Sequence, residues 1–116
     1  MSTDANEAQV ESTKDRLRLI LGDEGLARLD ESCVMVIGLG GVGSNCVEAL
    51  ARGGVGSLVL LDRDVVAPSN VNRQAIAFAS TLGRPKAEVM RQMVLDINPD
   101  ARVTAVRAFL PKDGID

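Results

Sequence analysis

A glycine-rich stretch is the first part of this sequence whose residue types point to chemistry. Residues 37–44 are IGLGGVGS; the apolar run CVMV precedes them and NCVEALAR follows. A glycine-rich turn between a buried strand and a helix holds phosphate, because its amides and the helix dipole face the anion and no Cβ keeps the ligand away. The stretch therefore predicts a nucleotide-binding loop, without saying which nucleotide binds.

The glycines of this loop have different expected roles. Gly38, Gly40 and Gly43 match the GxGxxG spacing, in which the first glycine permits a tight turn and the third lets the helix pack closely on the strand. Gly40 and Gly41 let the backbone approach a phosphate. Asp62 closes the next apolar run, where an acidic residue accepts hydrogen bonds from ribose hydroxyls. These residues fit NAD as well as ATP.

Charged and amide side chains further along the chain favour ATP. The chain continues through RDVV at 63–66, SNVNRQ at 69–74 and GRPK at 83–86. Attack on a nucleoside triphosphate builds negative charge on phosphoryl oxygens that cations stabilise, whereas hydride transfer needs no such cations. We expect the following side chains around the phosphates: Arg73 and Lys86 as cations, Asn70 and Gln74 as hydrogen-bonding partners, and Asp64 as a ligand of Mg²⁺ or of the nucleotide.

The elements that position these residues are predicted from hydrophobic periodicity. Apolar runs at 33–38 and 57–62 predict strands buried on both faces, and alternation at 102–108 predicts a third strand. Helical spacing predicts helices at 14–22, 23–32, 75–80 and 86–98, and one directly after the glycine loop. This order predicts an α/β, Rossmann-like parallel sheet, the N-terminal half (β-α-β-α-β) of a doubly wound fold, preceded by short helices.

Two details of packing are also expected. In the helix after the glycine loop, Val42, Cys46, Ala49 and Leu50 share one face by helical spacing. Cys33 and Cys46 lie inside apolar segments and form no CxxC pair. Both are therefore expected to be buried structural thiols and not metal ligands.

Composition excludes several classes of function for these 116 residues, which suffice for one small domain. The absence of histidine excludes a histidine base, a Ser-His-Asp triad and a histidine-ligated metal. A net charge of −3 and only two phenylalanines argue against a nucleic-acid clamp or a base-stacking platform in this segment. No signal peptide or membrane span is visible in the sequence, so a reduced, cytoplasmic setting is the default.

The domain organisation follows from the polar N-terminus and the thin sheet. Residues 1–12 are small and polar and predict a disordered tail, and residues 13–116 form the N-terminal part of an ATP-binding domain. Three parallel strands with so few helices leave a sheet poorly covered. We therefore expect a truncated piece of a longer protein, or one that needs a partner, with little activity by itself. A complete minimal domain is the alternative.

Four ordered motifs, GLGGVGS, LLDRDVV, SNVNRQ and GRPKAEVM, together resemble the ubiquitin-activating-enzyme-like superfamily, which includes ThiF. The resemblance covers roughly residues 14–110. Within the superfamily, EALAR after the glycine loop, the NxNRQ form of the next motif, and KAEVM before INP look most like a branch of tRNA-modifying dehydratases. That branch closes the threonylcarbamoyl group of a modified adenosine beside the anticodon into a ring. Adenylyltransferases of sulfur-carrier proteins are the alternative branch.

The resemblance implies a reaction and a set of residues. ATP–Mg²⁺ binds, and a substrate carboxylate attacks the α-phosphate to give an acyl-adenylate and pyrophosphate. By resemblance, the phosphate loop comprises Gly38, Gly40, Gly41 and Gly43, Asp62 holds the ribose, and the phosphates are surrounded by Asp64, Asn70, Arg73, Gln74 and Lys86. Arg16 corresponds to an arginine that enters a neighbouring subunit's site, which implies a homodimer.

The resemblance also implies partners. These are a tRNA, whose binding surface is expected outside this segment, and a sulfur-carrier protein or cysteine desulfurase. A later Mg²⁺-binding aspartate and any catalytic cysteine would follow Asp116. Two rival interpretations stay open: an NAD-binding half-domain, and a non-catalytic nucleotide-binding subunit that pairs with a second chain.

Overall fold

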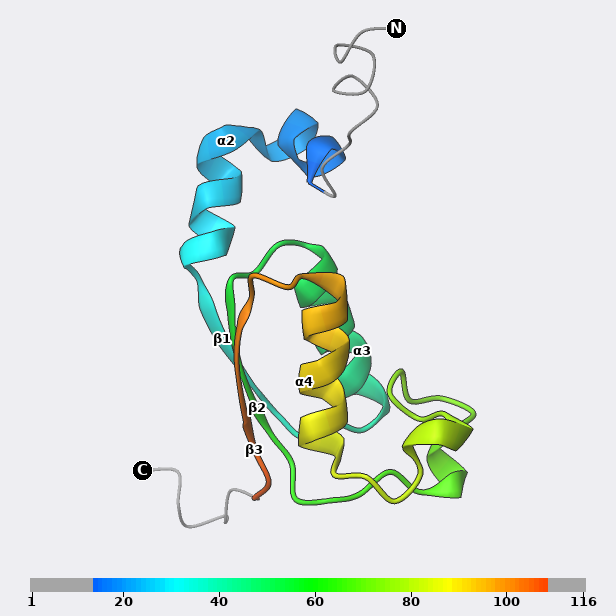
Figure 1. Ribbon diagram of the computed structural model, residues 1–116. Helices are drawn as coiled ribbons and strands as arrows, with labels where there is room; N and C mark the ends of the chain where they lie inside the picture. Colours follow the sequence, from blue (N-terminus) through cyan, green and yellow to red (C-terminus); the bar gives the residue numbers. More distant parts are fainter. Residues whose placement is uncertain (1–13, 109–116) are drawn as a thin grey trace, which may run out of the picture.

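The computed structural model describes residues 14–108, which form a three-stranded sheet with helices (Figure 1). The strands β1 (Cys33–Ile37), β2 (Ser57–Leu61) and β3 (Arg102–Val106) are parallel and lie in the order β1-β2-β3. Two helices, α3 (Gly41–Arg52) and α4 (Lys86–Ile97), lie on the same face of this sheet. The predicted order of strands and long helices is confirmed, while the predicted tail, residues 1–12, lies outside the described residues.

The long connection between β2 and α4 is mostly irregular. It contains two short 3₁₀ helices, η1 (Pro68–Asn70) and η2 (Ala79–Thr81), where the sequence predicts one helix at 75–80. Four hydrophobic residues of the core lie in or next to this connection and are at most 4% exposed: Val66, Ile76, Ala77 and Ala87. The connection is therefore packed on the same core as α3 and α4, and its polar side chains have defined positions.

The strand register brings the carboxyl ends of the strands to one edge of the sheet. Ile37 pairs with Leu61, and Leu61 pairs with Val106. The core lies between the sheet and the helices, where Leu58 and Leu60 are at most 1% exposed. Polar residues that follow the strands therefore meet at one edge, where ligands of parallel α/β sheets bind.

The opposite face of the sheet is open among residues 14–108, so the prediction of strands buried on both faces is wrong for this structure. Met35 and Ile37 are 58% and 53% exposed, and Val106 is 38% exposed. Both sets of alternating side chains in β1 are apolar, which is the pattern of a doubly covered strand. The described helices α3 and α4 supply only one covering layer, and this is the reason for the difference (Figure 1).

The buried face of α3 also differs from the predicted one. Ser44, Val47 and Ala51 are buried, whereas Val42 is 89% exposed. The close approach of Gly43 to the end of β1 fixes the rotation of the helix and turns Val42 outward. Cys46 then faces solvent.

Cys33 is exposed as well, because it alternates with Met35 and Ile37 along β1. The prediction of two buried thiols is therefore wrong, because each thiol lies on an uncovered side of its own element.

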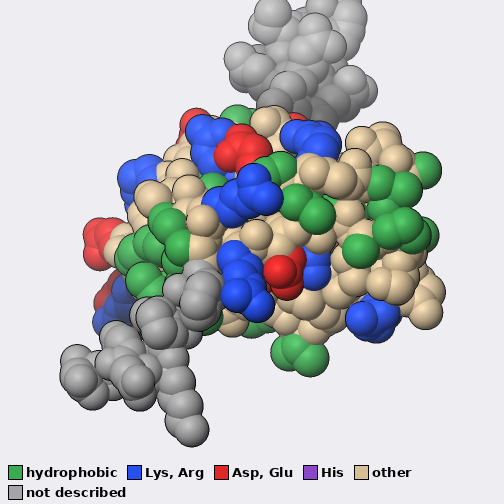
Figure 2. All heavy atoms as spheres, turned by 90° about the horizontal axis from the view of Figure 1, so that it is seen from below, with side chains coloured by type: hydrophobic (Ala, Val, Ile, Leu, Met, Phe, Trp, Pro, Cys, Tyr) green, Lys and Arg blue, Asp and Glu red, His purple; other side chains and the backbone are tan. Residues whose placement is uncertain are grey.

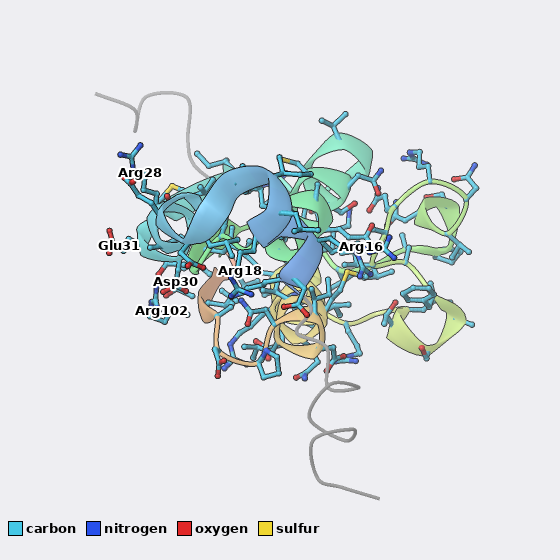
Figure 3. The ribbon with its side chains drawn as sticks, turned by 90° about the horizontal axis from the view of Figure 1, so that it is seen from above. Arg16, Arg18, Arg28, Asp30, Glu31 and Arg102 are labelled. Atoms are coloured by element: carbon cyan, nitrogen blue, oxygen red, sulfur yellow. The ribbon has the colours of Figure 1, made fainter. Side chains whose placement is uncertain are left out.

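The helix α2 (Asp15–Glu31) is interrupted at Gly22, where φ is +72°. This confirms the predicted break between two helical segments. Arg102 of β3 joins the end of α2 to the sheet, because its Nη2 donates to the carbonyl oxygen of Asp30 at 2.6 Å and its Nε donates to Oγ of Ser57 at 2.8 Å (Figure 3). A cation at a helix C-terminus also interacts favourably with the helix dipole. No helix within residues 14–108 has the length and apolar character needed to cross a membrane.

We expect Arg102→Ala to lower the free energy of unfolding by about 0.5–1.5 kcal/mol, since it removes hydrogen bonds that link three elements. Arg28→Ala is the matched control, because Arg28 pairs only with Glu24 of the same helix at 2.8 Å and both side chains are exposed; such pairs contribute about 0.3–0.5 kcal/mol. Urea unfolding measures both values. Equal effects of the two substitutions would contradict a linking role for Arg102.

Candidate functional site

The carboxylate of Asp62 joins the glycine loop to the loop that follows β2. Its Oδ2 accepts the N–H of Leu39 at 2.6 Å, and its Oδ1 accepts the N–H of Asp64 at 2.7 Å. Asp62 is only 8% exposed, and hydrogen bonds to an ionised carboxylate are short and strong. The sequence predicts a ribose-binding role for this residue, and the structure adds that Asp62 holds two loops together.

The glycine loop has the geometry that a phosphate-binding turn requires. Gly38 has φ +88°, a conformation that favours glycine. A Cβ on Gly43 would overlap the carbonyl oxygen of Gly38, which is the close helix–strand approach expected for the third glycine. A Cβ on Gly40 would meet no atom within 4 Å, so the outer side of the loop is open to a ligand.

Arg73 lies directly against this loop. A Cβ on Gly41 would lie 3.8 Å from Cγ of Arg73, so the aliphatic part of the arginine covers the first turn of α3. Its Nη1 donates to the carbonyl oxygen of Ser69 at 2.8 Å, while the side chain stays accessible to solvent. The structure thus brings a cation to the start of the helix at which the phosphates are expected.

Hydrogen bonds within residues 67–75 fix the segment that carries Arg73. Oδ1 of Asn70 accepts the N–H of Ala67 at 2.8 Å, and the carbonyl oxygen of Asn70 accepts the N–H of Gln74 at 2.9 Å. The side-chain oxygen predicted to meet phosphates is thus engaged in shaping its own loop. Asn70 is 7% exposed, which agrees with a structural contribution.

Ser44 attaches this segment to α3. Its Oγ accepts the N–H of Ala75 at 3.2 Å, and Ser44 is fully buried. Ser44 is not among the residues predicted for the site, and in the sequence only its position directly after Gly43 points to it.

Lys86 is the most unusual charged residue of the site. It begins α4, it is 7% exposed, and its N–H donates to the carbonyl oxygen of Asp64 at 2.9 Å. Within residues 14–108, its ammonium group forms no hydrogen bond or ion pair. Lysine is almost never buried without a partner, because desolvation of the charge is costly. The site therefore has the charge to receive an anion.

A crevice of about 230 Å³ opens at the carboxyl ends of the strands. Its walls include Ile37, Gly38, Leu61, Asp62 and Asp64. The side chain of Asp64 is 63% exposed, and its Oδ1 lies 3.8 Å from Nε of Arg63. Figure 2 looks at this side of the molecule and shows Lys and Arg side chains near its centre with fewer acidic ones.

A second groove, which we call the α3 groove, has a volume of about 490 Å³ and lies between α3 and the connection. It is lined by Asn45 and Glu48 of α3 and by residues from 71–79. Gln74, expected near the phosphates, lines this groove; it is 7% exposed and its Oε1 is buried without a hydrogen-bond partner among the described residues.

Arg16 is a predicted site residue that lines neither the crevice nor the α3 groove of its own chain. It lies at the start of α2, at the opposite end of the sheet from the carboxyl edge (Figures 1 and 3). Among the described residues, no group of three or more Cys, Asp or Glu side chains is placed to hold a metal ion.

The family model described as "ThiF family" matches residues 12–116. The chain belongs to the ThiF family. It is 48% identical over 98 residues to the tRNA threonylcarbamoyladenosine dehydratase of Bacillus subtilis, and this match covers 84% of this chain and 39% of that protein. It is 42% identical over 92 residues to the molybdopterin-synthase adenylyltransferase of Salmonella typhimurium, and this match covers 79% of this chain and 37% of that protein. The chain thus spans less than half the length of these relatives.

Solved structures show the same fold. The crystal structure of the E. coli tRNA N6-threonylcarbamoyladenosine dehydratase matches with a TM-score of 0.84 and 40% identity, over 87% of this chain and 42% of that chain. The same enzyme in complex with ATP matches with a TM-score of 0.79 and 38% identity, over 89% of this chain and 45% of that chain. The Rossmann-like fold and the family predicted from the four motifs are confirmed.

We expect Gly43→Ala to destabilise the fold by about 1–3 kcal/mol or more, because the new methyl group overlaps a backbone oxygen that cannot move away. Gly41→Ala is the matched control in the same loop, since its methyl group would meet only Arg73 at ordinary contact distance. Thermal unfolding followed by circular dichroism measures both. A Gly43→Ala protein as stable as the Gly41→Ala protein would show that the close approach is absent.

A second pair of substitutions separates the two aspartates. Asp62→Asn replaces one acceptor oxygen with an NH₂ group that cannot accept a backbone N–H. We therefore expect the free energy of unfolding to fall by about 1–3 kcal/mol. Asp64→Asn leaves the backbone groups of residue 64 in place, and its exposed side chain has little effect on stability. Urea unfolding at neutral pH provides the comparison; if both variants unfold at the wild-type midpoint, Asp62 does not hold the loops.

Proposed function

We propose that this chain binds ATP at the carboxyl edge of the sheet and serves the adenylation of a substrate carboxylate. The observation that carries the proposal is Lys86, a lysine only 7% exposed whose ammonium group has no counter-ion among residues 14–108. The backbone of Lys86 is linked through Asp64 and Asp62 to Leu39 in the glycine loop. A relative of 38% identity is known in complex with ATP, which supports this choice of nucleotide.

Different residues of the site contact different parts of the nucleotide in this proposal. The amides at Gly40 and Gly41 and the N-terminus of α3 attract the phosphates. Arg73 and Lys86 neutralise the negative charge that develops when the α-phosphate is attacked. A carboxylate has about four acceptor positions, so Asp62 retains capacity for ribose hydroxyls beside its two backbone bonds.

The site offers Mg²⁺ one exposed carboxylate, that of Asp64. This ion usually takes one or two carboxylates together with phosphates and waters. The exposed carboxylate of Asp64 at the crevice would supply one such ligand. Bound Mg²⁺ would neutralise phosphate charge; the residues of this chain would orient the nucleotide around it.

In the proposed reaction, a carboxylate oxygen forms a bond to the α-phosphorus and pyrophosphate leaves. We propose the threonylcarbamoyl carboxylate of a modified adenosine in tRNA as the substrate, since the chain is 48% identical to a dehydratase named for that nucleoside. The runner-up is the C-terminus of a sulfur-carrier protein, supported by similarity to the molybdopterin-synthase adenylyltransferase. A cytoplasmic homodimer in which Arg16 serves the neighbouring subunit, and a cysteine desulfurase as a further partner, complete the proposal.

We expect Lys86→Met, which keeps the volume of the buried side chain, to weaken ATP binding by about 10- to 100-fold through loss of a charged hydrogen bond. Arg84→Ala is the matched control, two residues away with an exposed side chain, and should bind ATP as the wild type does. Isothermal titration calorimetry with ATP measures both affinities.

The same calorimetry with NAD tests the rival nucleotide. Wild-type protein that binds NAD more tightly than ATP, or a Lys86→Met protein with unchanged affinity for ATP, would overturn the proposal.

A further inference from the structure

The side chain of Arg73 is held at both of its ends. Its aliphatic part lies over the first turn of α3, since a Cβ on Gly41 would be 3.8 Å from Cγ and 3.9 Å from Cδ of Arg73. Its Nη1 donates to the carbonyl oxygen of Ser69 at 2.8 Å and to Oδ1 of Asn72 at 3.3 Å. A long arginine side chain has many rotamers in solution, and these contacts restrict them before any ligand binds.

The shape of the turn makes the carbonyl oxygen of Ser69 available to this side chain. The carbonyl oxygen of Asn70 accepts the N–H groups of both Arg73 and Gln74, at 3.1 and 2.9 Å. In a regular α-helix the N–H of Arg73 would instead bond to Ser69, four residues earlier. The guanidinium of Arg73 takes the place of that N–H, as cationic side chains do at the last carbonyls of helices.

This anchoring leaves one edge of the guanidinium unused. Arginine has five N–H donors, and two of them belong to Nη1. Within residues 14–108, Nε and Nη2 of Arg73 form no hydrogen bond and no ion pair. The donors of Nε and Nη2 are parallel, which is the geometry that binds two oxygens of one phosphate group. The anchored nitrogen therefore sets the orientation of an edge that suits phosphate.

We propose that Asn72 is a positioning residue, whose side-chain oxygen holds Nη1 of Arg73 and so keeps the edge formed by Nε and Nη2 ready for a phosphate of ATP. This inference rests on the proposed function, which gives Arg73 its ligand. The carbonyl oxygen of Ser69 alone would hold Nη1 at one point, about which the guanidinium could still turn. The second acceptor, Asn72, opposes that rotation.

The residue type at position 72 suits this role. Asn72 is exposed, unlike the buried Asn70, whose Oδ1 accepts a backbone N–H of the same segment. The side chain of Asn72 therefore contributes to the orientation of Arg73 more than to the fold. A neutral amide oxygen also orders the cation without cancelling its charge, whereas a carboxylate there would repel the phosphates. The charge of Arg73 thus stays available to the nucleotide.

The first experiment uses the nucleotide-free chain and NMR relaxation of the Nε–H group of Arg73, which reports motion on the picosecond-to-nanosecond timescale. Asn72→Ala should lower the order parameter of this group. Asn72→Asp, which keeps an acceptor oxygen, should leave it at the wild-type value. Asn45→Ala is the matched control, because Asn45 is an exposed asparagine of the α3 groove whose side chain forms no hydrogen bond within residues 14–108.

The second experiment measures ATP affinity by calorimetry in a double-mutant cycle. Asn72→Ala should weaken ATP binding by about three- to tenfold, because binding then has to order a long side chain that was ordered beforehand. In an Arg73→Ala background the same substitution should leave the affinity unchanged, since the group that Asn72 positions is gone. Asn45→Ala should bind ATP as the wild type does.

The two experiments separate this inference from the proposed function. An equal order parameter in the wild type and in Asn72→Ala would overturn the positioning role. An equal loss of ATP affinity with and without Arg73 would overturn it as well, and would assign Asn72 a direct contact with ATP. Wild-type protein that binds no ATP overturns the proposed function, while the relaxation data still decide whether Asn72 orders Arg73. If Asn72→Ala does not fold by circular dichroism, Asn72→Ser, with its shorter polar side chain, replaces it in both experiments.

Discussion

The carboxylate of Asp62 accepts one backbone N–H from the glycine loop and one from the loop after β2. A buried carboxylate is costly unless it is hydrogen-bonded, so these two bonds compensate for its burial and also fix the distance between the loops. The carbonyl oxygen of Asp64 then accepts the N–H of Lys86, which extends the connection to the start of α4. Three segments far apart in sequence thus meet at the carboxyl edge with a geometry that one side chain determines.

A second connection holds the opposite side of the glycine loop. Oγ of the buried Ser44 accepts the N–H of Ala75, and the aliphatic part of Arg73 contacts the first turn of α3. The link through Asp62 comes from the loop after β2, and the link through Ser44 and Arg73 comes from the segment between β2 and α4. Together they leave the outer surface of Gly40 open. The backbone that would face phosphates is thus held by contacts on its inner side and is accessible on its outer side.

Much of this arrangement could be predicted from sequence because it depends on local patterns. The glycine spacing, the acidic residue at the end of β2 and the apolar face of α4 each have a direct physical meaning. The rotation of α3 could not be predicted, since it depends on where Gly43 meets Gly38 in space. The contribution of Ser44 depends on a residue 31 positions away, and the exposure of Met35 depends on whether a second helical layer is present. Each of these is a property of tertiary contacts that periodicity does not encode.

The open face of the sheet affects how the chain behaves in solution. Met35 and Ile37 of β1 and Val106 of β3 form exposed apolar surface on the two strands that flank β2, and Cys33 lies on the same side of β1. Exposed apolar patches of this kind favour aggregation, and an accessible thiol among them is open to oxidation. The colloidal and redox stability of the chain therefore depend on a surface that meets the crevice only at Ile37. A reducing buffer protects the thiol of Cys33, which lies at the other end of β1.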